Sequence, residues 1–110
     1  MTARERLASL SDARRRLIRL MQSINFGTIE DLEVRGGEPM FSPPPRVVRE
    51  IKFGGENGPR PETALPDFAV KSPVADLLHS LTKIGDGTIE RLEVRHGVPF
   101  RMKVEEPMRA

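Results

Sequence analysis

The sequence predicts an internally duplicated α+β domain of two helix-strand-strand units with pseudo-twofold symmetry, which form an antiparallel sheet of four or five strands with two helices on one face. Two observations lead to this prediction. Residues 27–39 and 87–99 match at ten of thirteen positions when they are aligned at an offset of 60. Each segment also follows a stretch with apolar residues at helical spacing. Because a unit of about 50 residues is near the lower limit for independent folding, we expect one shared core and a single domain over residues 1–110.

The first unit covers approximately residues 12–53 and begins with an amphipathic helix. Apolar residues recur at helical spacing from about residue 2 to Ile24. Ser11 can cap a separate helix, so a break near residue 10 is the alternative to one long helix. Gly27 supplies the helix stop, because glycine readily adopts the left-handed conformation that closes many helices.

The strand that follows, residues 28–35, alternates over its second half, with Leu32 and Val34 on one face. Ile29 is out of register with them by one residue. The spacing therefore predicts either a bulge near residues 30–31 or a strand that starts later.

Turn and edge signals follow this strand. Gly36-Gly37 predicts a two-residue hairpin turn of type I′, which needs positive φ at both central positions. A short return strand is then interrupted by prolines, which favour an extended edge or crossing segment because they cannot donate to a ladder. A strand is expected to resume over residues 46–53.

The second unit covers approximately residues 72–106, after a connector over residues 54–71 that is rich in glycine and proline. Ser72 is expected to cap its helix, with Pro73 at the first helical position. A strand over residues 88–95, a turn at His96-Gly97 and a final alternating strand complete the unit.

Folding explains most of the identities between the units, since glycines serve turns and aliphatic residues fill a core. The polar identities remain: Thr28, Glu30, Glu33 and Arg35, repeated as Thr88, Glu90, Glu93 and Arg95. They indicate either solvated strand positions that form cross-strand ion pairs or a pair of symmetry-related binding surfaces. The candidate interaction residues are Glu33, Arg35, Glu93, Arg95, Pro43, Pro44 and Pro45.

Residues 24–29 (Ile-Asn-Phe-Gly-Thr-Ile), followed by a hairpin glycine and by Ile-Lys-Phe at residues 51–53, resemble the short bacterial YezD-like proteins. The resemblance covers the first half of the chain and implies a helix, an Ile-x-Phe/Tyr-Gly-Ser/Thr step and a small hairpin. The second unit departs from it, with Gly85-Asp86 in place of Asn25-Phe26. That family has no established activity, so the resemblance implies no mechanism.

Basic residues concentrate near the start of the chain. The formal net charge is only +2, so bulk charge does not indicate a nucleic-acid partner. Arginines near the start fall at helical spacing, however, and can face phosphates along one ridge. These candidate nucleic-acid residues are Arg4, Arg15, Arg16 and Arg19. The alternative is a solvated helix face balanced by acidic strands.

The sequence gives little indication of enzymatic chemistry. There is no cysteine, which excludes disulfides and thiolate sites. His79 and His96 have no spaced partner, and Glu30 and Glu33 point to opposite strand faces unless the bulge realigns them. No phosphate-binding loop or zinc spacing is present. We therefore expect no enzyme activity, cofactor, metal or small-molecule substrate.

The chain has no apolar run of membrane-spanning length and no signal-peptide core, so a cytoplasmic location and no membrane partner are expected. The leading functional hypothesis is a small non-enzymatic interaction module that binds another protein, or itself as a homodimer, through its sheet edges and proline segment. The alternative is a duplex nucleic-acid-binding protein that uses the N-terminal arginine helix.

Overall fold

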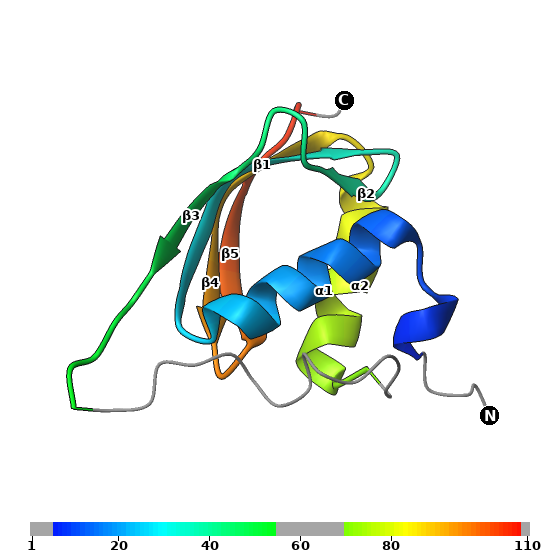
Figure 1. The fold of residues 1–110 in the computed structure, drawn as a ribbon. Coiled ribbons are helices and arrows are strands. Elements are labelled where there is room, and N and C mark those ends of the chain that lie inside the picture. Colours follow the sequence, from blue (N-terminus) through cyan, green and yellow to red (C-terminus); the bar gives the residue numbers. More distant parts are fainter. Residues whose placement is uncertain (1–5, 55–69, 109–110) are drawn as a thin grey trace.

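The structure, a computed structural model, describes residues 6–54 and 70–108. Two α-helices lie on one face of a five-stranded antiparallel sheet (Figure 1). The strand order is β2-β1-β4-β5, and β3 pairs with β1 beside β2. The predicted α+β class, sheet and helix placement are confirmed.

The first helical segment divides in two. A 3₁₀ helix, η1, spans Leu7–Ser9, and α1 spans Asp12–Ile24. The Ser11 hydroxyl accepts a hydrogen bond from the Arg14 N–H, which satisfies a free donor of the first helical turn. One helix from residue 2 to Ile24 is therefore wrong over the described residues, and the alternative with a break near residue 10 is confirmed. The start of the predicted helix, residues 2–5, lies outside them.

The second helix, α2, spans Ser72–Ile84. Its cap is Lys71 rather than the expected Ser72, and no side chain caps it. The first intrahelical bond runs from the Ala75 N–H to the Lys71 carbonyl at 2.9 Å, so the chain enters the helix one residue earlier than the sequence pattern suggests. Pro73 lies in the first turn, but it is the second helical residue and not the first as predicted.

The two long strands, β1 (Gly27–Arg35) and β4 (Gly87–Arg95), pair antiparallel at the centre of the sheet. Thr28 lies opposite Glu93, and their counterparts at the offset of 60, Thr88 and Glu33, lie opposite each other as well. The register is therefore symmetric between the two units. Their origin by internal duplication stays a prediction.

The pairing of these two strands is interrupted at one position. Asp31 has φ +59°, and the ladder passes from Glu30 paired with Arg91 to Leu32 paired with Ile89, which leaves out Asp31 and Glu90 but keeps the register. At this level the register shift lies between β4 and β5, at Ile89 and Arg91. A late strand start is wrong, because β1 starts at Gly27, and the irregular backbone at Asp31 accounts for the spacing of Ile29 and Leu32 without a bulge against β4.

Shorter strands lie along both sides. β2 (Glu38–Met40) and β3 (Arg46–Arg49) pair with successive halves of β1, and β5 (Val98–Glu105) pairs with β4. The predicted strand over residues 46–53 is too long. Gly27 lies opposite Arg49, so residues beyond Glu50 would face the end of α1 and find no strand to pair with.

The core lies between the helices and the sheet. Every buried apolar residue from Leu17 to Val34 has a buried apolar counterpart 60 residues later. Leu7, Val70 and Val74 complete the core. Val70 belongs to the expected connector over residues 54–71, most of which lies outside the described residues.

Candidate functional site

The repeated polar residues gather on the sheet face that the helices leave open. Ile29, Leu32 and Val34 are all buried against the helices, and the irregular backbone at Asp31, with its positive φ, keeps them on one face. Glu30 and Glu33 therefore both lie on the outer face. The irregular backbone at Asp31 brings their side chains to the same face.

Glu30 is held by two neighbours. Arg46 of β3 forms an ion pair with it, and the Thr28 hydroxyl donates to Glu30 Oε2 at 3.0 Å. The hydrogen bond from Arg46, and then that from Thr28, lowers the pKa of Glu30 below its ordinary value. This carboxylate therefore stays ionised near neutral pH, which does not suit a general acid.

The four charged interaction candidates also form ion pairs. Arg35 lies 3.7 Å from Glu33, and Arg95 lies 3.9 Å from Glu93, which Arg101 contacts more closely. These contacts favour the interpretation as solvated strand positions with local ion pairs. Such exposed pairs contribute about 0–1 kcal/mol each.

A hollow of about 700 Å³ opens on the outer face above the first half of β1. Its lining includes Phe26, Thr28, Glu30, Val48, Glu93 and His96. The Phe26 and His96 rings meet edge to face with centroids 4.7 Å apart. His96 thus has an aromatic neighbour that the sequence pattern did not reveal, whereas His79 is exposed on α2.

The predicted arginine cluster is largely engaged within the protein. Arg15 pairs with Asp12, Arg16 lies over the Phe41 ring at 4.5 Å, and Arg19 donates to Gln22 Oε1 at 3.3 Å. Arg4 lies outside the described residues. The structure does not bring these side chains together as one free basic ridge.

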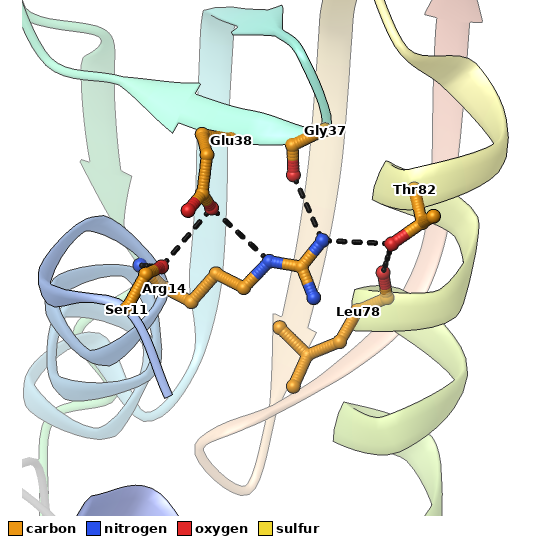
Figure 2. Close-up of polar contacts among 6 residues, drawn as sticks. All are labelled: Ser11, Arg14, Gly37, Glu38, Leu78 and Thr82. Atoms are coloured by element: carbon orange, nitrogen blue, oxygen red, sulfur yellow. Dashed lines mark hydrogen bonds and ion pairs between the residues drawn. The ribbon is translucent and has the colours of Figure 1, made fainter. Parts of the chain in front are cut away.

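Arg14, which the predicted cluster omitted, joins three elements (Figure 2). Its Nε donates to Glu38 Oε2 at 3.1 Å, and one terminal nitrogen donates to the Gly37 carbonyl at 3.0 Å and to the Thr82 hydroxyl at 2.8 Å. The Ser11 hydroxyl also donates to Glu38 Oε2. Arg14 therefore fastens α1 to the first hairpin and to α2, which is a structural role.

Exposed apolar residues gather at the edge formed by β3 and the residues after it. Val47 and Val48 are 44% and 47% exposed, and Ile51 and Phe53 are 57% and 93% exposed. The chain continues away from the sheet in extended form after β3 (Figure 1). The sequence predicts a strand over residues 46–53, but it does not show that the apolar side chains there stay uncovered.

The proline candidates lie at the same side of the sheet. Pro43, Pro44 and Pro45 connect β2 to β3, and the first two are exposed while Pro45 is half-buried. The structure thus places the proline segment next to the exposed edge. Glu93 and Arg95 lie on β4, on the other side of β1, and they line the same outer-face hollow as Val48 of β3.

Within residues 6–54 and 70–108, no three histidine, cysteine or carboxylate side chains are grouped to hold a metal ion. None of the helices in this part of the chain has the length and apolar character needed to cross a membrane. No protein-family model, curated protein or solved structure matches the chain.

Proposed function

We propose that the protein is a small, non-enzymatic cytoplasmic interaction module that binds a protein partner through the sheet edge at β3. One observation carries the proposal: all four residues of β3 are exposed, and Ile51 and Phe53 extend the exposed apolar surface beyond it. Edge strands of this kind are templates for pairing with another chain.

The charge pattern supports edge recognition. Main-chain hydrogen bonds along an edge give affinity, and alternate side chains give specificity. Here the basic residues Arg46, Arg49 and Lys52 are interspersed with apolar ones. The proline segment before β3 fixes one end of this edge because its three residues cannot donate backbone hydrogen bonds.

Affinity capture with the full chain tests the proposal. The double variant Ile51→Ser, Phe53→Ser removes exposed apolar side chains at the edge, whereas Met108→Ser removes an equally exposed one elsewhere. We expect a protein partner that binds the wild type and Met108→Ser, that loses affinity for the double variant, and that binds in the same way once purified. A partner unaffected by the double variant would overturn the edge assignment.

The alternative, duplex nucleic-acid binding by the arginine helix, remains a second proposal with less support. Arg15 and Arg16 are each engaged by a neighbour, although both keep exposed surface. Fluorescence anisotropy with labelled duplex DNA and RNA across a salt series separates the two proposals. Binding that weakens steeply as salt rises would favour nucleic acid, because counterion release dominates such complexes. Absence of binding at low salt would exclude it.

A further inference from the structure

We infer that the partner at this edge is a second copy of the chain, joined by antiparallel pairing of β3 with β3 about a twofold axis at Val48. The inference rests on the proposed function, because it uses the same edge. It is carried by the direction of the backbone groups along β3 and by the order of charges on its outer face.

The free backbone groups can be assigned from the ladder. The Glu50 N–H donates to the Phe26 carbonyl at 2.8 Å, in the same register that places Val48 opposite Thr28. Because backbone groups of alternate residues point to opposite edges of a strand, those of Val47 and Arg49 point away from β1. No strand pairs with that side of β3 among the residues that the structure describes.

The side chains can be assigned in the same way. Val48 and Glu50 line the outer-face hollow together with Thr28 and Glu30. Arg46, which alternates with them and contacts Glu30, lies on this face as well. On the outer face of the edge the side chains are therefore positive at Arg46, apolar at Val48 and negative at Glu50.

This order is self-complementary. If Val47 of one copy lies opposite Arg49 of the other, their outward N–H and carbonyl groups can bond reciprocally, and Val48 meets its own copy at the axis. Arg46 then lies opposite Glu50 on both sides of the axis. In this register Val48 faces its own copy and Arg46 faces the oppositely charged Glu50. Val47 packs against the aliphatic part of the Arg49 side chain.

Other registers also let the outward backbone N–H and carbonyl groups of the two copies face each other, but their side-chain pairs are less favourable. Shifting toward the C-terminal side brings Arg49 or Glu50 opposite its own copy, and like charges directly opposite are destabilising. Shifting the other way places Pro45, which has no N–H, opposite Arg49 and removes the ion pairs. The favoured register joins the two sheets and brings the two hollows together across the axis.

Analytical ultracentrifugation of the full chain over a wide concentration range tests this inference. We expect the mass to rise from 12.3 kDa toward twice that value as the concentration increases. Val47→Pro removes an outward N–H without touching the β1 ladder and should weaken association by about tenfold or more. Val47→Thr, which keeps the N–H, is the matched control and should associate as the wild type does.

A charge test identifies the register. Glu50→Arg sets arginine against Arg46 of the other copy, and Arg46→Glu sets glutamate against Glu50, so each variant alone should associate weakly. Mixing the two variants restores both ion pairs and should yield a heterodimer. Circular dichroism shows whether each variant is folded. Arg46 also pairs with Glu30, so if Arg46→Glu does not fold, Val47→Pro still decides the test.

A chain that stays monomeric at all concentrations, or a dimer that Val47→Pro and Glu50→Arg leave intact, overturns the inference. A monomeric chain that still loses a different protein partner in the Ile51→Ser, Phe53→Ser variant overturns only the self-pairing and leaves the proposed function in place. A monomeric chain with no edge-dependent partner overturns both.

Discussion

The Gly37 N–H donates to the Gly85 carbonyl at 2.9 Å, which ties the first hairpin turn to the end of the second helix. The counterpart bond at the offset of 60, from the Gly97 N–H to the Asn25 carbonyl, is also 2.9 Å long. Each unit therefore closes the helix end of the other. Because these bonds are reciprocal, the turns act as cross-links between units, and substitutions at them test the arrangement.

Gly37 should tolerate substitution much less well than Gly36. Both have positive φ, but a Cβ on Gly37 would approach the Thr82 Cα to 3.3 Å, whereas one on Gly36 meets nothing within 4 Å. We expect Gly37→Ala to lower the free energy of unfolding by about 2–3 kcal/mol, and Gly36→Asn by less than about 1 kcal/mol. His96 already occupies the position equivalent to Gly36 with φ +55°. Equal losses in urea denaturation would contradict this prediction.

The Arg14 contacts should contribute to stability as a coupled set. Its side chain is only 19% exposed and reaches Glu38 and Thr82. We expect Arg14→Met to cost about 1–3 kcal/mol and to show coupling of about 0.5–2 kcal/mol with Glu38→Gln in a double-mutant cycle. Arg15→Met, which loses an exposed pair with Asp12 and an exposed 3.5 Å hydrogen bond to the Ala8 carbonyl, is the control and should cost less than about 1 kcal/mol. Additive losses would show that Arg14 and Glu38 act separately.

Local patterns in the sequence were sufficient for the main elements. The one-residue shift between Ile29 and Leu32 predicted an irregular backbone near residues 30–31, because buried residues must return to the same face after an extra residue. The glycine turns and the apolar stripes likewise predicted hairpins and helices. These features depend on neighbours in the chain, and a single sequence records them directly.

Features that depend on distant residues could not be predicted in the same way. The ion pair between Glu30 and Arg46 requires the register of β3 against β1, which the prolines between β2 and β3 obscure. The contact of Arg14 with Thr82 requires the two helices to be placed side by side. The exposed edge also depends on distant residues, because the start of β1 at Gly27, opposite Arg49, limits the length of β3.

The ion pair at Glu30 should make this carboxyl titrate below its ordinary value of 4.5. A carboxyl with a lowered pKa in the folded state stabilises the fold above the pKa of the unfolded chain and loses that contribution as pH falls through the folded value. The stability change therefore belongs below about pH 4.5. We expect Arg46→Gln to raise the pKa of Glu30 in an NMR titration, whereas Arg101→Gln, on the far strand, leaves it unchanged. A wild-type pKa at the ordinary value would contradict the structure.

The shared core should make the two units unfold together. Met21 and Leu81 lie 60 residues apart, on different helices, and both side chains are fully buried. We expect Met21→Ala and Leu81→Ala each to cost about 2–5 kcal/mol. His79→Ala, exposed on α2, should change stability by less than about 0.5 kcal/mol. Circular dichroism and calorimetry should show a single cooperative transition in each variant, since neither unit covers its own apolar face. Two separated transitions would mean that each unit has a core of its own.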